Sequence, residues 1–388
     1  MSASTDLSAS DHAPAAGAGL SDRWRRAAEA EQEAGLPRGA AVVSCTAPLG
    51  TGGLGRHLSE LADALRRRNG SGPTCICGST GDGERGRVAG TPTFARLAQR
   101  LSSLGAPLSP ALRTWATMSE FDASAARRLP RAEHLIAFNG QACSQFDAAR
   151  ELRYESIALV SANSHLRRVI RQHACARRQY PIERTWPSHL LRRNLAEYAR
   201  ADRIYVASRY IRDSFLAEGV GEERLASFPL TPHPRYDATA ERIPSERFDV
   251  VYVGSLAVHK GVPLLIDAVR SLAHRDLRLL LVGGWGTRGM RRFVEDARAR
   301  DARIVVCPGD PLPRLRAAAL CVHPAYEDGF GYAPAEALAC GVPVLVSEDT
   351  GMKDLIDRGR NGLVLPTGDL NALTEAIDAA YRAGGRVG

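Results

Sequence analysis

Short apolar runs recur along the chain, and between them apolar residues repeat at intervals of three or four. The runs predict buried strands, and the longer-period stretches predict helices with one buried face. The predicted strands cover residues 40–45, 74–78, 134–138, 156–161, 202–208, 248–253, 277–282, 304–307, 320–324, 342–346 and 362–365. Because strands and helices alternate throughout, we predict an α/β fold with two doubly wound, Rossmann-like domains that face each other across a cleft.

The length of 388 residues also favours two domains, since one ordinary core rarely extends that far. Four prolines interrupt any regular pattern late in the first half, so we place an interdomain linker at 229–247. The first domain then spans 36–228 and the second spans 248–388. Residues 1–35 begin with a stretch rich in Ser, Ala, Asp and Gly, and we expect a disordered or loosely helical extension there.

The net charge of +8 is concentrated in the first half of the chain. Residues 1–240 carry 32 arginines against 24 acidic residues, whereas residues 241–388 carry 19 basic and 19 acidic residues. Residues 165–212 alone hold twelve arginines and three acids. Such a patch fits a phosphate-bearing partner or an anionic membrane surface, and a solvated helical face is the alternative. Nucleic acid is disfavoured as a partner, because few aromatic residues are interleaved with these arginines.

The cysteines and the hydropathy indicate the cellular compartment of the protein. No run approaches the ~20 apolar residues that span a bilayer, and we find no charged segment followed by an apolar one, as in a secretory signal. The eight cysteines are scattered, and Cys75 and Cys77 lack the second pair that would complete a zinc site. We therefore expect buried thiols in a reducing cytoplasm. The basic patch would allow a peripheral position on the inner face of the membrane.

Two glycine-rich turns follow predicted strands and precede predicted helices. The turn at 47–55 contains Gly53, and the turn at 254–261 contains Lys260. Turns of this kind at the carboxyl edge of a parallel sheet often cradle a ligand, although many are only tight connections. Neither has the Gly-Lys-Ser/Thr ending of a Walker loop. Lys260 is notable because only two of the 51 basic residues are lysines.

Residues 326–345 combine carboxylates with a tight turn. Glu327 and Asp328 precede a Gly-Phe-Gly turn, and Glu336 follows in a predicted helix. Backbone N–H groups at the start of that helix suit an anion such as phosphate. Carboxylates suit hydroxyl groups, since an ionised carboxylate only accepts hydrogen bonds. Phosphate and hydroxyls in one place indicate a nucleotide sugar, and a plain loop–helix–strand connection is the alternative.

His165 lies just after the strand predicted at 156–161. That position is the sheet edge where α/β proteins bind their ligands. A single histidine has little specificity, and a hydrogen-bonded loop residue is the alternative to a chemical role.

Taken together, these motifs resemble those of the GT-B fold, retaining glycosyltransferases of family 4 (glycosyl transferases group 1). The resemblance covers about residues 38–384 and is loose in the first half, where only Gly52-Gly53 and the stretch 197–219 agree. In the second half four elements agree, namely Gly254-Ser255-Leu256 with Lys260-Gly261, Gly283-Gly284-Trp285-Gly286, Asp328-Gly329-Phe330-Gly331 with Glu336, and Asn361-Gly362-Leu363-Val364. The family has two glutamates separated by seven residues at the third element, and Asp328 stands at the first of those positions.

The resemblance implies transfer of a sugar, with retention, from a nucleotide-sugar to a hydroxyl acceptor in polysaccharide or glycoconjugate biosynthesis. Glu336 would accept from the ribose hydroxyls, and Asp328 and His165 would lie beside the donor sugar. Lys260 would neutralise the diphosphate, and Gly53 would let a first-domain loop approach it. The backbone that would hold the sugar hydroxyls and the diphosphate is that of Gly329, Phe330, Gly331 and Tyr332.

Two residues depart from the family pattern. Ser255 stands where the family commonly places an arginine, and Arg56 or another first-domain arginine is a candidate replacement. Asp328 is one methylene shorter than glutamate, so Glu327 is the alternative if the register shifts by one. We expect no cofactor and no metal, because Lys260 and backbone amides would stabilise the leaving diphosphate.

Several readings of the function stay open. The acceptor is either a growing glycan on a lipid diphosphate or a soluble small molecule, and it would meet the basic first domain. A non-catalytic GT-B scaffold or sugar-binding subunit is the main alternative to a glycosyltransferase, and a GT-B sugar epimerase is a further one. The donor base, the sugar and the linkage do not follow from the residues.

Overall fold

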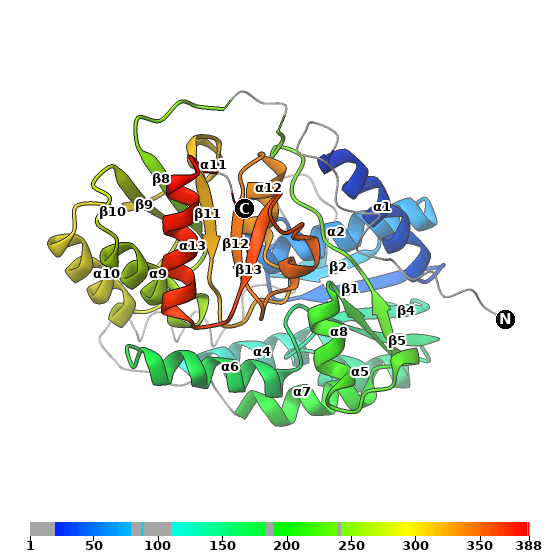
Figure 1. The fold of residues 1–388 in the computed structure, drawn as a ribbon. Coiled ribbons are helices and arrows are strands. Elements are labelled where there is room, and N and C mark those ends of the chain that lie inside the picture. The colour runs from blue at the N-terminus through cyan, green and yellow to red at the C-terminus, as the bar shows by residue number, and fades with distance from the viewer. Residues whose placement is uncertain are drawn as a thin grey trace.

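Two parallel β-sheets organise the protein, one in each half of the chain (Figure 1). The computed structural model describes residues 20–78, 87–88, 110–183, 189–238, 242–385 and 387. Within these residues the first sheet has seven strands in the order β3-β2-β1-β4-β5-β6-β7, and the second has six in the order β10-β9-β8-β11-β12-β13. All pairings between these strands are parallel. The predicted α/β class with two doubly wound domains is confirmed.

The first domain contains the five predicted strands in order and two further ones, β3 and β7, that were not predicted. Its strands are β1 (Ala41–Cys45), β2 (Thr74–Cys77), β3 (Arg87–Val88), β4 (His134–Phe138), β5 (Ser156–Ser161), β6 (Arg203–Val206) and β7 (Leu225–Ser227). Its helices are α1 (Leu20–Gly35), α2 (Gly52–Asn69), α4 (Pro110–Ala126), α5 (Cys143–Glu151), α6 (Leu166–Gln179), α7 (His189–Arg200) and α8 (Arg209–Leu216), with a 3₁₀ helix at Glu222–Arg224. Helices cover both faces of the sheet, so strands such as β1 and β4 are buried along their whole length.

The second domain repeats this plan. Its strands are β8 (Phe248–Val253), β9 (Leu277–Val282), β10 (Ile304–Cys307), β11 (Leu320–His323), β12 (Val344–Ser347) and β13 (Gly362–Leu365). Its helices are α9 (Val262–Ser271), α10 (Arg288–Arg300), α11 (Leu312–Ala317), α12 (Tyr332–Ala339) and α13 (Leu370–Arg382), with 3₁₀ helices at Val258–Lys260 and Gly351–Leu355. The strand order reverses between β8 and β11, which places a topological switch point there.

The N-terminal helix is part of the first domain rather than a loose extension. Residues Leu20–Gly35 form the helix α1, and its partners lie in α2 and next to β7. Glu33 accepts from Arg67 of α2 at 2.8 Å, and the Trp24 ring lies 6.3 Å from the ring of Phe330. These contacts correct the expectation of a loosely helical segment for residues 20–35, while residues 1–19 lie outside the described part of the chain.

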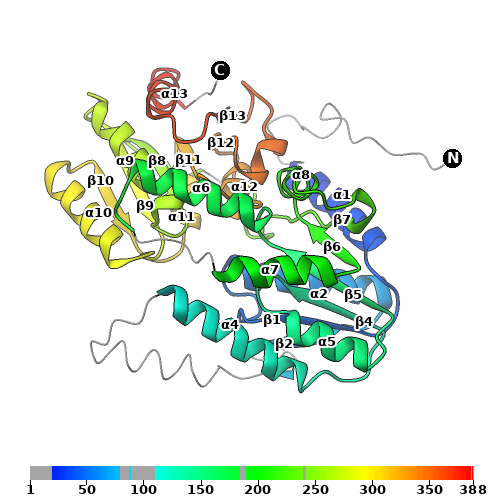
Figure 2. The same cartoon turned by 90° about the horizontal axis from the view of Figure 1, so that it is seen from below.

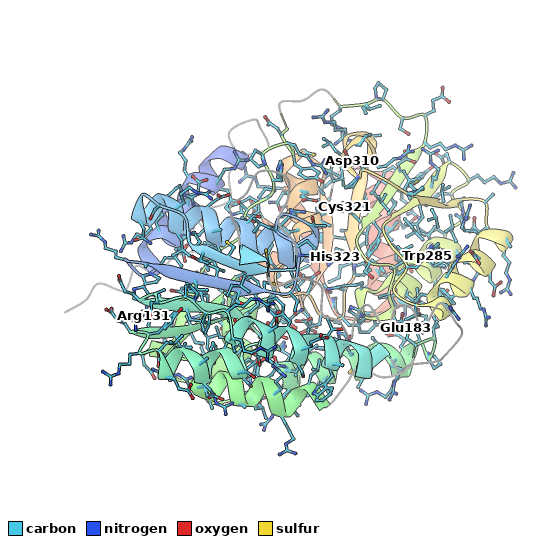
Figure 3. All side chains as sticks on the ribbon, turned by 180° about the vertical axis from the view of Figure 1, so that it is seen from behind. Arg131, Glu183, Trp285, Asp310, Cys321 and His323 are labelled. Atoms are coloured by element: carbon cyan, nitrogen blue, oxygen red, sulfur yellow. The ribbon has the colours of Figure 1, made fainter. Side chains whose placement is uncertain are left out.

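Helix α6 departs most from the predicted division into domains. It belongs to the first domain by sequence, yet in Figure 2 it lies along the second domain, where its contacts are with the 3₁₀ helix at Val258–Lys260. Ala176 is buried in the hydrophobic core of the second domain, and Tyr180 donates to Asp267 of α9 at 3.0 Å. Just beyond α6, Glu183 accepts from the backbone N–H of Val258 at 3.2 Å (Figure 3). A helix that precedes the linker expected at 229–247 therefore packs on the domain that follows it.

The two domains face each other through the carboxyl ends of their strands. Ser164, after β5, donates to Glu327, after β11, and Ser208, after β6, donates to the Gly329 carbonyl at 2.6 Å. Arg168 of α6 pairs with Asp349, after β12, at 2.8 Å. The predicted facing arrangement is present, and the two edges touch directly. Among the described helices, none is long and apolar enough to cross a membrane.

Candidate functional site

The site forms at the switch point of the second sheet, where the loops after β8 and β11 run side by side. Gly261 sits at the end of the β8 loop with φ +73°, and a Cβ there would come within 2.0 Å of the Pro324 carbonyl oxygen in the β11 loop. Only glycine permits this approach. The close approach brings Lys260, at the end of the first loop, to Asp328 in the second.

Asp328 is held by two cationic or hydrogen-donating groups. Its Oδ2 lies 3.0 Å from Lys260 Nζ and 2.9 Å from His323 Nε2. Burial opposes ionisation of this carboxyl, but the Lys260 charge and the His323 hydrogen bond hold its pKa well below the usual range. Asp328 is therefore a carboxylate at all physiological pH values, with Lys260 fixed beside it.

Glu327 points the opposite way, toward the first domain. Its Oε1 accepts from both the backbone N–H and the hydroxyl of Ser164, at 3.0 and 2.9 Å, and Asn163 donates to Oε2 at 3.3 Å. Burial raises the pKa of this carboxyl, and its side chain is enclosed by the interdomain contact. Of the two adjacent carboxylates, Asp328 is the one that lies beside Lys260.

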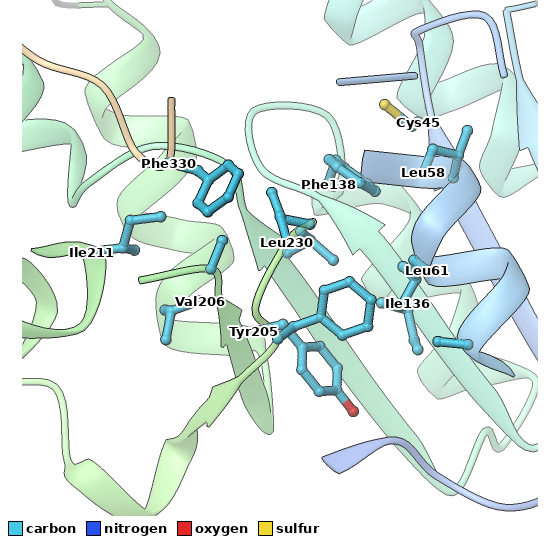
Figure 4. Close-up of a cluster of buried hydrophobic side chains, with 14 of the residues drawn as sticks. Cys45, Leu58, Leu61, Ile136, Phe138, Tyr205, Val206, Ile211, Leu230 and Phe330 are labelled. Atoms are coloured by element: carbon cyan, nitrogen blue, oxygen red, sulfur yellow. The ribbon is translucent and has the colours of Figure 1, made fainter. Parts of the chain in front are cut away.

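The turn that follows is shaped by contact with the first domain. A Cβ on Gly329 would lie 2.2 Å from the Ala162 carbonyl oxygen, so only glycine fits there. The Phe330 side chain turns away from the backbone and packs among Val206, Ile211 and Leu230 (Figure 4). Gly331, with φ +93°, begins α12. The first amides of α12 thus lie next to the Asp328 loop, where they suit an anion.

Glu336 and Tyr332, both on α12, are engaged by the first domain. Glu336 Oε1 lies 2.5 Å from a terminal nitrogen of Arg56 on α2. The Arg56 guanidinium also stacks 4.0 Å over the Tyr332 ring, and the Tyr332 hydroxyl donates to Glu60 at 2.7 Å. Burial raises the pKa of Glu336, and the Arg56 charge opposes that rise. The carboxylate expected to meet ribose is thus already paired with an arginine.

Ser255 and Gly53 lie at the edges of this arrangement. Ser255 is exposed, and its carbonyl accepts from the Tyr252 hydroxyl at 2.8 Å. Gly53 is also exposed, in the first turn of α2, and a Cβ there would have no described atom within 4 Å. The close backbone contact in this loop belongs to Gly55, where a Cβ would lie 2.0 Å from the Pro48 carbonyl oxygen. Any constraint on Gly53 would come from a ligand.

His165 occupies an interior position of the first domain. Its side chain is 3% exposed and lies between the rings of Tyr198 and Phe215, at 4.8 and 5.1 Å. It begins α6, where its Nδ1 accepts from the backbone N–H of Arg167. Burial lowers the pKa of the imidazole to about 4. The ring is therefore enclosed within the first domain, and its neighbour Ser164 makes the interdomain contact with Glu327.

Two residues of the site, His323 and Glu60, carried no sequence signal, and Arg56 was named only as a candidate replacement for the arginine missing at Ser255. His323 is the last residue of β11 and lies in the strand predicted at 320–324. Glu60 also accepts from the backbone N–H of Thr231, at 3.0 Å. Its contact with Tyr332 joins residues 272 positions apart. No spacing rule finds such pairs, because they arise only when the two domains meet.

The arginine-rich stretch is partly neutralised by acidic residues, most of them from other segments. Among its described residues six arginines form ion pairs, namely Arg167 and Arg171 with Glu218, Arg168 with Asp349, Arg193 with Asp122 and Glu197, Arg200 with Asp147, and Arg212 with Glu222. The local excess counted along the sequence therefore overstates the charge that this surface presents.

One group of potential metal ligands lies elsewhere among the described residues, at Glu133, His134 and Glu155. Both ring nitrogens of His134 are already engaged, by the Ser156 hydroxyl at 2.8 Å and the Arg38 carbonyl at 2.7 Å. The histidine has no nitrogen left for a metal in this arrangement.

Comparison with known proteins places this geometry in context. Residues 247–383 match the family described as glycosyl transferases group 1. A D-inositol 3-phosphate glycosyltransferase from Pseudarthrobacter chlorophenolicus is 31% identical over 145 residues, which is 34% of this chain and 34% of that protein. The match thus spans about a third of that curated relative.

Solved structures resemble the chain over nearly its whole length. Sucrose-phosphate synthase from Thermosynechococcus elongatus superimposes with a TM-score of 0.65 at 18% identity, covering 90% of this chain and 91% of the other. The Anabaena protein HepE, in complex with UDP-glucose, gives 0.61 at 16% identity, covering 89% and 90%. The chain therefore has the GT-B fold of glycosyltransferases, and its second domain matches glycosyl transferases group 1.

Proposed function

We propose that this protein is a glycosyltransferase that moves a sugar from a nucleotide-sugar to a hydroxyl acceptor. The observation that carries the proposal is the group formed by Lys260, Asp328 and Glu336 around the start of α12, at the switch point of the second sheet. That sheet lies in the domain that matches glycosyl transferases group 1. A GT-B neighbour has been solved with UDP-glucose.

Each part of the donor has a matching partner in this group. The diphosphate would lie against Lys260 and the first amides of α12, since both favour negative charge. The ribose hydroxyls would donate to Glu336, and the sugar hydroxyls to Asp328. Breaking the bond between sugar and phosphate builds negative charge on the leaving diphosphate. Donors fixed in advance around that charge stabilise the transition state.

Retention of configuration and independence of metal ions are further parts of the proposal. Lys260, fixed 3.0 Å from Asp328, and the α12 amides would stabilise the leaving group without a divalent ion. Retention follows from the family resemblance, and no carboxylate of the described site is a clear nucleophile. Adding a chelator should leave turnover unchanged, and analysis of the anomeric product would test retention.

The acceptor would meet the first domain, whose strand ends face the donor group. A glycan on a lipid diphosphate and a soluble molecule are the two candidates, as intermediates of polysaccharide or glycoconjugate synthesis. The ion pairs of the arginine-rich stretch weaken the case for an anionic membrane surface, so a cytoplasmic soluble acceptor gains weight. Co-sedimentation with anionic liposomes separates the two, since only the membrane model requires binding.

A non-catalytic GT-B protein is the second candidate, favoured by a specific observation. Both carboxylates expected to hold the donor are paired with protein cations, Asp328 with Lys260 and Glu336 with Arg56. A protein that had lost its donor could keep these pairs as internal links. It would bind no nucleotide-sugar and transfer nothing.

A thermal-shift screen with UDP-, GDP-, ADP- and dTDP-sugars distinguishes the candidates. We expect one nucleotide to raise the melting temperature, because a ligand that binds only the folded state stabilises it. Release of the matching nucleoside diphosphate in the presence of an acceptor extract would then establish transfer. A chain that responds to none of the four donors would contradict the proposed function.

A further inference from the structure

Arg56 forms an ion pair with Glu336, the carboxylate that would bind the ribose of the proposed donor. It lies on α2 of the first domain, and its guanidinium nitrogen is 2.5 Å from Oε1 of Glu336 on α12 of the second domain. The Glu336 side chain is 3% exposed, against 25% for Arg56. The two side chains form an ion pair of opposite charges at the domain contact. Hydroxyl donors of a ligand can take over this carboxylate when the arginine gains another anionic partner, because neither charge is then left unpaired.

The surroundings keep Arg56 in place even without Glu336. Its guanidinium stacks on the Tyr332 ring at 4.0 Å, and Glu60 lies one helical turn further along α2. Glu60 accepts from the Tyr332 hydroxyl at 2.7 Å, so it faces the same ring. Arg56 therefore lies between two carboxylates, one in each domain. Release from Glu336 leaves it beside Tyr332, the first residue of α12.

The start of α12 is where the diphosphate of the donor would lie. Ser255 stands where an arginine could meet that diphosphate, and its side chain provides no positive charge. Lys260 is already paired with Asp328 at 3.0 Å. A dianionic diphosphate bound here would face Lys260, whose charge is already partly balanced by Asp328. A second cation would therefore stabilise it further. Arg56 is paired with Glu336 of α12, so ribose binding at that carboxylate would set this cation free.

We propose that Arg56 exchanges partners when the donor binds, leaving Glu336 to the ribose hydroxyls and moving to the diphosphate. This inference rests on the proposed function. It makes Arg56 a specificity-determining residue, because a ligand with ribose alone must break the Arg56–Glu336 pair without gaining a new one. A nucleoside diphosphate compensates for the broken pair through its own charge. Through Arg56, the first domain would favour ligands that carry both a ribose and a diphosphate.

The test compares a nucleoside with its diphosphate in the full chain, using the base found in the donor screen. In Arg56→Gln the nucleoside should bind more tightly, by about threefold or more, since Glu336 no longer has a competing cation. The diphosphate should bind roughly tenfold more weakly, which is the usual size of one charged hydrogen bond. Calorimetry measures the diphosphate, and saturation-transfer NMR measures the weaker nucleoside.

Two variants control for general effects of the substitution. Arg56→Lys keeps a cation and should retain the wild-type ratio of the two affinities within about threefold. Arg168→Gln removes another arginine that bridges the domains, to Asp349, and should leave the ratio unchanged. If Arg56→Gln weakens or strengthens both ligands by the same factor, the exchange of partners is wrong. If the wild-type chain binds no nucleoside diphosphate, the proposed function itself is wrong. That result comes from the wild-type chain alone and is distinct from the outcome for the variants.

Discussion

The two facing sheet edges differ in what they contribute to the site. The second-domain edge presents fixed charges, Lys260 and Asp328, from loops that share one switch point. The first-domain edge presents hydroxyl groups, Ser164 and Ser208, that bind the Glu327 carboxylate and the Gly329 carbonyl. One edge therefore carries the charges that chemistry would use, and the other holds the loop that carries them. Arg56 is the exception, a first-domain charge placed on a second-domain carboxylate.

The adjacent residues Glu327 and Asp328 show this difference within a single loop. Glu327 is directed to the first domain and receives two hydrogen bonds from Ser164. Asp328 is directed back into its own domain, to Lys260 and His323. The backbone of Asp328 is fixed at both its ends, by Asp349 at 3.1 Å and Gly351 at 3.0 Å. A loop fixed in this way keeps one carboxylate structural and the other available to a ligand.

The largest expected effect comes from removing the charge at Lys260. Lys260→Ala should reduce transfer by roughly 100-fold or more, because a preorganised cation on the leaving group is lost. Donor affinity should fall as well, measured by calorimetry with the nucleotide-sugar from the screen. Asp328 also loses its ion pair, so the melting temperature should drop.

Lys353 supplies the matched control, since it is the only other lysine in the chain. Its ammonium donates to the Glu348 carbonyl at 2.9 Å and lies 5.3 Å from the centre of the Tyr210 ring. Lys353→Ala should leave donor affinity and turnover close to wild type. Equal losses in the two variants would show that Lys260 acts through general stability and not through the diphosphate.

Exchanging the carboxylates for amides one at a time tests the two directions within the loop. Asp328→Asn should lower turnover by about tenfold or more with little change in melting temperature, because its surroundings can bind an amide oxygen. Glu327→Gln can keep one oxygen for the two Ser164 donors, but its N–H₂ then takes the place of Oε2 and faces the Asn163 amide donor. That should cost about 1–3 kcal/mol of stability and a few degrees of melting temperature.

Turnover per folded molecule separates these outcomes. We expect Glu327→Gln to stay within about threefold of wild type once the folded fraction is corrected by circular dichroism. Ser164→Ala should reproduce its loss of stability more weakly, since the backbone N–H remains. The reverse pattern, with turnover lost in Glu327→Gln and kept in Asp328→Asn, would place the chemistry on Glu327.

His165→Asn asks whether the first-domain edge contributes an imidazole. Asparagine is a good N-cap, so the start of α6 should be preserved while the ring between Tyr198 and Phe215 is lost. From its burial we expect a loss of about 1–3 kcal/mol in stability and a change in turnover below about fivefold. A drop of 100-fold with a normal melting temperature would restore the role that the family resemblance implies for this residue.

The sequence predicts the second domain better than the first for a physical reason. The predicted strand boundaries at 248–253, 277–282, 304–307 and 362–365 agree with β8, β9, β10 and β13. Buried parallel strands are short apolar runs, and the glycine turns after them need special backbone angles, so both leave local marks. Lys260 and Asp328 stand in such turns, and the structure brings them together.

Contacts between the domains produce no comparable local pattern in the sequence. Helix α6 reads as an arginine-rich amphipathic helix of the first domain, and nothing in its pattern shows that Ala176 packs in the second. Arg56 and Glu336 were each expected to meet the donor, and nothing in the sequence indicates that they pair with each other. Their pairing depends on how two folded units dock, which periodicity does not encode. His165 shows the opposite case, because its place after a strand predicts a ligand while its ring lies in the interior of the first domain, and its role stays a prediction.

The smallest expected effect concerns Glu60, a carboxylate at the domain contact. Burial raises its pKa to about 7, against the hydrogen bonds from Tyr332 and Thr231 and the charge of Arg56. The ordinary pKa of the group is 4.5, so between about pH 4.5 and 7 the folded protein binds more protons than the unfolded one. Stability from this group is therefore lost as the pH rises through that window, by at most about 1.4 kcal/mol per pH unit.

Glu60→Gln removes that dependence at the contact alone. Burial also raises the pKa of Glu197, inside the first domain, to about 7, so a slope of the same sign should remain in the variant. We expect the melting temperature of Glu60→Gln, relative to wild type, to rise by a few degrees from pH 5 to pH 8. A constant offset across this range would mean that Glu60 titrates near its ordinary value. The Glu60 carboxylate would then be ionised throughout this range, and its contribution to stability at the domain contact would not change with pH.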